Sequence, residues 1–192
     1  MPVTLRSWPY LRLKLNALTQ LVLGRRQAAI PVFDAMLDRW PDDAYALASR
    51  AHLHAESGNA ALALADAERL VERHPDRRAA DWFNLAFLRD SLGQHAAAEG
   101  AFRRALELEP KLDRAWYGLG LTLIRLGRLD EAVAALKRNT ELQPLSPFGW
   151  YQLARVHANR SEPEKARRII GHLKNFEPKV AAQLERETGL MA

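Results

Sequence analysis

Residues 113–144 decide the fold of this chain, and they read DRAWYGLGLTLIRLGRLDEAVAALKRNTELQP. Trp116, Leu119 and Leu123 recur at the spacing of one helix face, which predicts a first helix with one buried side. Gly127 follows that face, and glycine readily adopts the left-handed conformation that closes a last helical turn. A second apolar stripe then begins. The stretch therefore predicts two antiparallel helices joined by a tight turn.

This two-helix pattern repeats along the chain every 34 or 35 residues. Proline closes each unit because it lacks the amide hydrogen that a continuing helix needs, and glycine marks the internal turns. At residues 161–164 the sequence S-E-P-E replaces the glycine, and Ser161 with Glu164 predicts a capping box. One helix pair cannot bury both of its faces, so the units must stack on one another. The periodic residues are Pro41, Pro75, Pro110, Pro144 and Pro178, with Gly24, Gly58, Gly93 and Gly127 before the first four prolines.

The units also share short motifs. W-x-x-L-[GA] begins at Trp82, Trp116 and Trp150, and a later A-x-x-x-F pattern is present in full at Ala98 and Phe102. With the closing prolines, these motifs resemble the tetratricopeptide repeat (TPR). The resemblance implies an all-α fold, a right-handed superhelical solenoid of antiparallel helix pairs with a concave groove. It divides the chain into a lead-in at 1–9, a single solenoid domain at 10–180 with repeats at 10–43, 44–78, 79–112, 113–146 and 147–180, and a C-terminal capping helix and tail at 181–192.

The resemblance also indicates which residues could bind a partner. In TPR proteins the first helix of each repeat lines the concave groove with its second, fifth, sixth and ninth positions. Aromatic side chains there would anchor a peptide or an amphipathic helix, while amides and arginines would bond its backbone or its acids. The same residue types also occur at these positions without a ligand, so a purely structural role stays open. The expected groove residues are Phe83, Asn84, Phe87, Arg114, Tyr117, Leu121, Phe148, Tyr151, Gln152 and Arg155.

One specific TPR ligand is not expected. The carboxylate clamp that binds acidic C-termini of chaperones needs lysine, asparagine and arginine at five positions of three successive first helices. In the best register only Asn84 and Arg114 fit that pattern. Most of the charge-assisted hydrogen bonds would be missing, so binding of chaperone tails is disfavoured.

The first repeat departs from the family pattern. Asn16 stands where a leucine belongs, and Pro31 falls inside or near the start of the second helix. Its first helix is apolar on more than one face, and four residues recur at i, i+4, i+7 and i+11. Such a stripe predicts a seam for a partner helix or a second copy of the chain, with packing beneath the preceding residues as the alternative. The stripe consists of Leu11, Leu15, Leu18 and Val22.

Charge is concentrated in the same segment. Residues 1–33 contain five cations and no acid, so this segment accounts for the whole net charge of +5 of the chain. A basic, leucine-rich helix can bind an anionic membrane surface, but Arg12 and Lys14 alternate with leucines, which makes this the less favoured interpretation. Nucleic-acid binding is not expected, since no aromatic stacking platform accompanies the cations. The five cations are Arg6, Arg12, Lys14, Arg25 and Arg26.

Composition excludes several classes of activity. The 192 residues include no cysteine, which rules out disulfides, thiolate metal sites and a cysteine nucleophile. Six scattered histidines are expected to be solvated or half-buried, and neither a phosphate loop nor a catalytic carboxylate pair is evident. We therefore expect no enzyme activity, no metal and no cofactor. With neither a secretion signal nor a run of about 20 apolar residues, the expected location is the cytoplasm.

The sequence thus favours a protein–protein interaction adaptor, or scaffold, that binds a partner protein or peptide in the groove and supports the assembly of a larger complex. The alternative is a structural assembly subunit whose first repeat docks on a membrane-associated complex or self-associates. A composition rich in alanine, arginine and leucine suggests a bacterial source.

Overall fold

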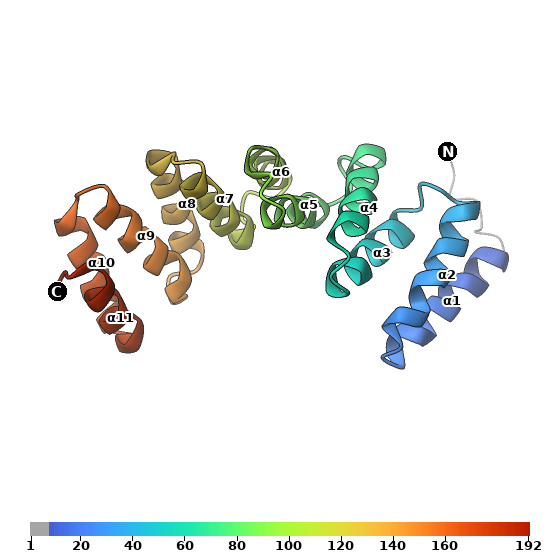
Figure 1. The fold of residues 1–192 in the computed structure, drawn as a ribbon, viewed down its shortest axis with the longest axis horizontal. Coiled ribbons are helices and arrows are strands. Elements are labelled where there is room, and N and C mark those ends of the chain that lie inside the picture. The colour runs from blue at the N-terminus through green and yellow to red at the C-terminus, as the bar shows by residue number, and fades with distance from the viewer. Residues whose placement is uncertain (1–7) are drawn as a thin grey trace. The chain divides into compact units, whose positions relative to one another are not determined.

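The computed structural model describes residues 8–192, and these form eleven α-helices joined by short turns (Figure 1). Their order and lengths are consistent with five helix pairs followed by one further helix. The lead-in predicted at 1–9 falls mostly outside the described residues, as does Arg6. The helices are α1 (Trp8–Val22), α2 (Arg26–Arg39), α3 (Ala44–Glu56), α4 (Ala60–Arg73), α5 (Ala79–Ser91), α6 (His95–Leu108), α7 (Asp113–Arg125), α8 (Leu129–Leu142), α9 (Pro147–Asn159), α10 (Pro163–Lys174) and α11 (Pro178–Thr188).

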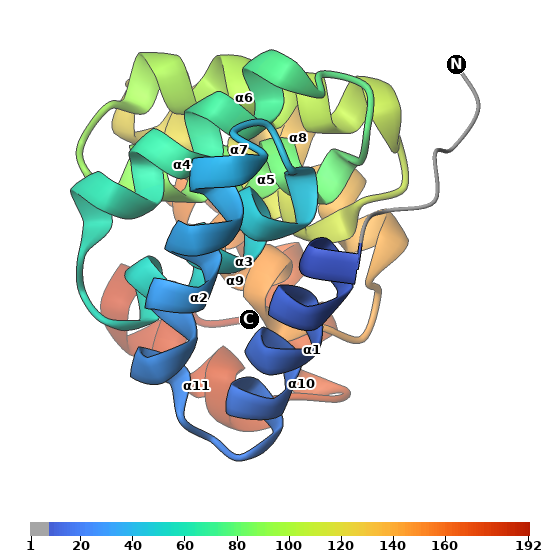
Figure 2. The ribbon, with the colours of Figure 1, turned by 90° about the vertical axis from the view of Figure 1, so that its right-hand side faces the viewer.

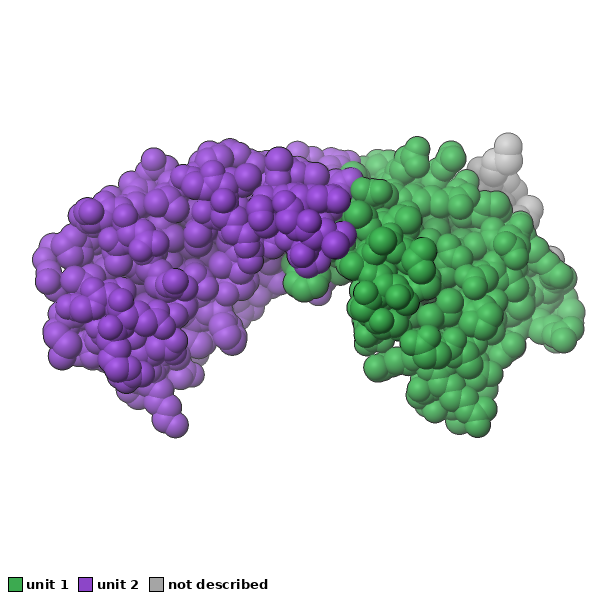
Figure 3. Space-filling model, in the orientation of Figure 1, with its two compact units in different colours: residues 1–88 green, residues 89–192 purple. Residues whose placement is uncertain are grey.

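The chain divides into two compact units, residues 1–88 and residues 89–192 (Figure 3). In the first unit α1 packs on α2, α2 on α3 and α3 on α4. Figures 1 and 2 show α1 and α2 running antiparallel from a short connecting loop. In the second unit each helix from α6 to α10 packs on the next, and α11 packs on both α9 and α10. Stacked antiparallel pairs confirm the predicted all-α fold class. The division into five repeats within one domain stays a prediction.

A hydrogen bond explains why tryptophan and proline keep the same period. The indole Nε1–H of Trp82 donates to the carbonyl oxygen of Pro75 over 2.7 Å. Trp116 and Trp150 make the equivalent bond over 2.9 Å to the prolines that close the preceding repeats. Each tryptophan therefore fixes the start of its own repeat against the end of the one before.

Small residues allow the paired helices to approach closely. A Cβ atom added to Gly120 of α7 would lie 2.7 Å from the side chain of Leu136 on α8. Ala132, at the start of α8, is fully buried. Larger side chains at either position would push the two backbones apart.

The internal turns depend on a left-handed residue. Gly127 has φ +73°, and the other turn glycines have similar values. Ser161, in the fifth turn, adopts φ +57° and so takes the conformation of the missing glycine. The predicted capping box is wrong, because Glu162 rather than Ser161 is the N-cap of α10, and no side chain caps that helix. Glu164 instead accepts a hydrogen bond from Arg167 on the same helix.

Two histidines differ from their predicted setting. His54 and His157 are buried, with 9% and 4% of their surface exposed, rather than solvated or half-buried. His157 Nδ1 lies 2.5 Å from a carboxylate oxygen of Glu162, which provides the buried ring with a polar partner. Sequence spacing gave no sign of this, since the two residues flank a turn.

The first repeat is confirmed as irregular. Pro31 lies inside α2, five residues after its first residue. Tyr10 and Ala17 form the buried face of α1, and Tyr10 packs edge-to-face on Trp40 with ring centroids 5.1 Å apart. The predicted stripe lies on the other face and is exposed; it comprises Leu11, Leu15, Leu18 and Val22. None of the helices in residues 8–192 is long and apolar enough to cross a membrane.

Candidate peptide-binding pocket

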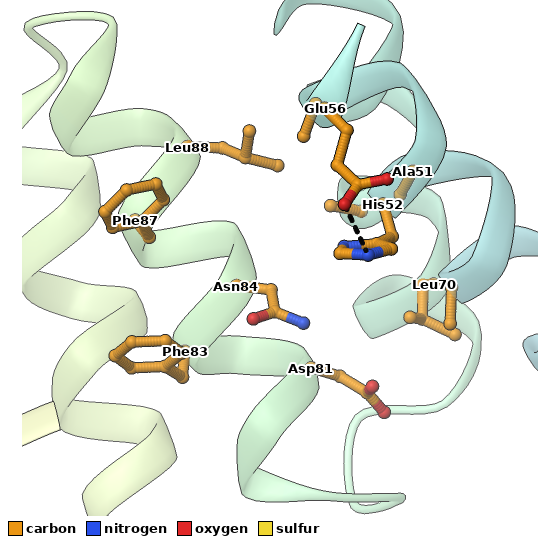
Figure 4. A pocket seen from close by; sticks show the side chains of 12 residues that line it. Ala51, His52, Glu56, Leu70, Asp81, Phe83, Asn84, Phe87 and Leu88 are labelled. Carbon is orange, nitrogen blue, oxygen red and sulfur yellow. Dashed lines mark ion pairs between the residues drawn. The ribbon is translucent and has the colours of Figure 1, made fainter. Parts of the chain in front are cut away.

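A pocket of about 440 Å³ lies between α3, α4 and α5 in the first unit (Figure 4). We call it the α3–α5 pocket. Its walls are mainly apolar, with polar side chains from α3 and α5 at the edge. This size falls within the range of pockets that hold small ligands or a few side chains. The lining residues are Ala48, Ala51, His52, Ala55, Glu56, Ala67, Leu70, Asp81, Phe83, Asn84, Phe87 and Leu88.

Alanines on α3 create the space. Ala48, Ala51 and Ala55 are three and four residues apart, so they lie on one face of that helix. Ala67 and Leu70 of α4 close the pocket from behind. A larger residue at any of these alanines would extend into the pocket. The opening is therefore a consequence of residue size at consecutive turns of α3.

The opposite wall belongs to α5. Asn84 and Leu88 point from that helix toward α3, whereas Phe83 and Phe87 project from its other side at the edge of the pocket (Figure 4). Asn84 is exposed, and its side chain hydrogen-bonds to no other described residue. Its amide thus offers two donor hydrogens and one acceptor oxygen to a ligand. Phe87 is 62% exposed, an unusual setting for so large an apolar side chain.

The charged groups around the α3–α5 pocket are largely paired within the protein. Glu56 Oε1 lies 3.5 Å from both His52 Nε2 and Arg26 Nη1. Asp81, almost fully buried, accepts a 2.7 Å hydrogen bond from Arg77. The pocket therefore presents an apolar interior and the free amide of Asn84, rather than a strong charge.

Next to the pocket, Arg50 of α3 joins three helices. It donates to both carboxylate oxygens of Asp66 on α4, over 2.6 and 2.8 Å, and to Asp34 on α2 over 2.6 Å. The hydrogen bonds to Asp66, and then the one to Asp34, raise the pKa of Arg50 above its ordinary value. They outweigh the partial burial of Arg50, which lowers that pKa. The network holds α3 in place between its two neighbours.

The predicted residues of the fifth repeat lie elsewhere, in the second unit. Tyr151 and Arg155 line a polar pocket of about 470 Å³ together with Ala158, Asn159, Glu187 and Thr188. The Tyr151 hydroxyl donates to the Glu187 carboxylate, with oxygen–oxygen distances of 2.7 and 2.9 Å. This bond raises the pKa of Tyr151 and lowers that of Glu187. Arg155 Nε lies 3.9 Å from the same carboxylate, so α11 already engages both residues.

Five predicted groove residues line neither pocket. Tyr117 packs against the buried cluster around Leu136, and Phe148 is 67% exposed. The α3–α5 pocket thus brings together three of the ten predicted residues, and the polar pocket two more. As ligand-binding residues, all ten stay a prediction. The five outside both pockets are Arg114, Tyr117, Leu121, Phe148 and Gln152.

The α3 wall was not anticipated from the sequence. Its signal was weak but present at Ala48, because the equivalent residues of the later repeats are the aromatic Phe83, Tyr117 and Tyr151. No group of three or more histidines and acids within residues 8–192 could hold a metal ion.

A sequence model of the tetratricopeptide repeat matches residues 15–78 and 83–147, about two thirds of the chain. The chain belongs to the tetratricopeptide repeat family. Proteins of this family typically mediate protein–protein or peptide binding and are usually not enzymes. No curated protein matches the sequence of this chain.

Solved structures of TPR proteins share the fold at low sequence identity. YrrB, described as a TPR protein with an unusual peptide-binding site, is 20% identical with a TM-score of 0.80, over 88% of both chains. MamA from Desulfovibrio magneticus is 15% identical with a TM-score of 0.80, over 94% of this chain and 97% of its own. A TPR protein from Parabacteroides merdae is 19% identical with a TM-score of 0.83, over 95% of this chain and 75% of its own.

Proposed function

We propose that this TPR protein is a non-catalytic adaptor that binds an extended segment of a partner protein at the α3–α5 pocket and thereby supports assembly of a larger complex. The observation that carries the proposal is the pocket itself: an apolar space of about 440 Å³ with the unpaired amide of Asn84 at its edge. That combination suits a peptide with a large apolar side chain and free backbone groups.

The binding mode follows from the chemistry of the two walls. One or two apolar side chains of the peptide would fill the space left by the alanines of α3, and their removal from water would supply most of the affinity. Asn84 would donate to a backbone carbonyl and accept from a backbone N–H of the same peptide. Phe83 and Phe87, at the edge, would cover adjoining parts of the ligand. YrrB shows that the same fold is compatible with a peptide-binding site.

The first experiment identifies a ligand and tests the role of Asn84. Peptides selected from a random display library on the immobilised protein should be rich in large apolar residues. For a selected peptide, Asn84→Ala should weaken binding about tenfold in fluorescence anisotropy, since it removes hydrogen bonds that the peptide backbone would otherwise make.

The matched control is Asn59→Ala. Asn59 is also exposed, lies in the same unit outside the pocket, and makes no capping hydrogen bond with its side chain. Its replacement should leave the affinity unchanged. A selected pool without apolar enrichment, or equal affinities of wild type and Asn84→Ala, would contradict the proposal.

A further inference from the structure

A second candidate interaction surface lies on α1, away from the α3–α5 pocket and independent of it. Leu11, Leu15, Leu18 and Val22 are 44%, 61%, 39% and 85% exposed. They recur at one face of the helix, so they form a continuous apolar stripe, which we call the α1 stripe. Single exposed leucines are common, whereas a row of four on one helix marks an interaction site.

The core of the first unit does not use this stripe. Tyr10 and Ala17 of α1 are buried, and Leu13 and Leu21 pack partly against the same core cluster. These residues are the apolar contacts of α1 with the core cluster of the first unit. The α1 stripe is therefore a second apolar face on a helix whose first face is already covered.

Cations flank the α1 stripe on both sides. At about 100° per residue, Arg12 lies roughly 100° around the helix from Leu11, and Lys14 roughly 60° in the other direction. Arg25 and Arg26 follow the helix end, where Arg26 Nη1 lies 3.5 Å from Glu56 Oε1, and residues 8–33 themselves contain no acid. Lys14 lies over the ring of Tyr45 on α3, with its Nζ 4.7 Å from the ring centroid.

A pocket of about 550 Å³ lies beside the flank of the α1 stripe that carries Arg12, and both Arg12 and Arg39 line it. Trp8, Arg12, Asn16 and Arg39 line it, with Pro9 and Leu13. Neither Arg12 nor Arg39 forms an ion pair with another residue in the described part of the chain. Two guanidinium groups beside an amide and an indole suit the phosphate of a lipid headgroup, which can accept several hydrogen bonds at once.

The arrangement of charge decides between the possible occupants. A second copy that packed its own α1 stripe on this one would bring cations against cations, which is unfavourable. A single acidic helix would reach the cations on one flank at a time. A bilayer with anionic headgroups reaches both flanks together, takes the leucines into its acyl boundary and places Trp8, which is 75% exposed, at the interface.

We propose that α1 docks this protein on the surface of a bilayer that contains anionic phospholipid, with the α1 stripe in the interface and Arg12 and Arg39 on a headgroup phosphate. This surface would bring the bound peptide partner to a membrane. Four exposed apolar residues and a few cations make such binding reversible and dependent on ionic strength.

Vesicle flotation tests the proposal with the full chain. At low ionic strength the protein should float with phosphatidylcholine vesicles that contain about a third phosphatidylglycerol, and remain below vesicles of phosphatidylcholine alone. Leu15→Gln/Val22→Gln, which removes apolar contact, and Arg12→Gln/Arg39→Gln, which removes charge, should each reduce the bound fraction about tenfold. All four residues are exposed, so the helix content measured by circular dichroism should not change.

Two control variants carry the same changes elsewhere. Leu62→Gln/Leu145→Gln alters two other exposed leucines, and Lys111→Gln/Lys179→Gln removes two other exposed cations. Both should float like the wild type. Equal binding to neutral and anionic vesicles, or wild-type flotation of either α1 variant, would overturn the proposal.

Three further results would also overturn it, each in favour of another ligand. Inorganic phosphate that binds in calorimetry as tightly as the anionic vesicles would indicate a site for a free anion. A dimer in light scattering that Leu15→Gln/Val22→Gln converts to a monomer would indicate self-association. Binding to a synthetic acidic amphipathic peptide without binding to vesicles would indicate a protein partner.

Discussion

At the scale of single residues, the fifth internal turn shows what a sequence pattern can and cannot predict. The period predicted a turn at Ser161, because four glycines precede it at the same position. The period did not predict that Ser161 would adopt φ +57°, because a capping box could also have begun the next helix without a left-handed residue. The structure shows that the chain must reverse through a left-handed residue whatever its side chain is. A non-glycine residue there costs conformational energy.

Replacing this serine by glycine should therefore stabilise the protein. For Ser161→Gly we expect the free energy of unfolding to rise by about 0.5–1 kcal/mol, because relief of strain in the folded state exceeds the added entropy of the unfolded chain. Urea unfolding measures the change. Ser146→Gly is the control: Ser146 has negative φ and makes no capping bond, so its replacement should bring no gain. An unchanged or lower stability for Ser161→Gly would show that Ser161 is not strained.

The neighbouring carboxylate makes stability depend on pH. The hydrogen bond with His157, and then Lys165 and Arg160, lower the pKa of Glu162 below its ordinary value. The ionised form thus stabilises the folded state at neutral pH, and this contribution is lost as the pH falls through the lowered pKa. Glu162→Gln should be less stable than wild type at pH 7, and the difference in urea midpoint should shrink below about pH 4. A constant difference across this range would contradict the pairing.

At the scale of helices, the sequence predicted the pairs because glycine and proline mark their ends. It could not decide which face of α1 is buried, since apolar residues occur on two faces and only their fit to the neighbouring helix distinguishes them. Tyr10 and Ala17 occupy the core, and the α1 stripe is exposed. The Arg50 network was also beyond prediction, because its partners are 16 residues away on either side.

Loss of Arg50 should destabilise the first unit strongly. Arg50→Met leaves the carboxylate of Asp66, which is 5% exposed, without its cation, and we expect a loss of about 3 kcal/mol in the free energy of unfolding. The double variant Arg50→Met/Asp66→Leu should recover most of that loss, because no buried charge remains. Thermal and urea unfolding provide both values. A small effect of the single variant would show that the network contributes little.

The proline inside α2 gives a prediction of opposite sign. Pro31 lacks the N–H that would bond to the carbonyl of Gln27 one turn earlier, and its ring crowds that carbonyl. Pro31→Ala should raise the free energy of unfolding by about 1–2 kcal/mol, less than the full cost of a helical proline because the unfolded chain gains entropy. A decrease in urea unfolding would show that α2 needs the proline.

At the scale of the whole chain, the family and the fold class follow from the period, whereas the candidate site follows only in part. Phe83, Asn84 and Phe87 were predicted because the family pattern assigns a role to their positions. The alanines of α3 that line the pocket were not predicted, because small side chains do not indicate a binding role in the sequence. The space that they leave depends on how α3, α4 and α5 pack. Open space is a property of packing, and a sequence pattern records it only indirectly.

Blocking the α3–α5 pocket tests the central claim most directly. Ala55 is exposed and lines the pocket, whereas Ala61, on α4 in the same unit, is exposed outside it. In isothermal titration with a selected peptide, Ala55→Phe should weaken binding about a hundredfold or more by filling the space of the apolar anchor, while Ala61→Phe should bind like wild type. Undiminished binding of the peptide to Ala55→Phe would show that its site lies elsewhere.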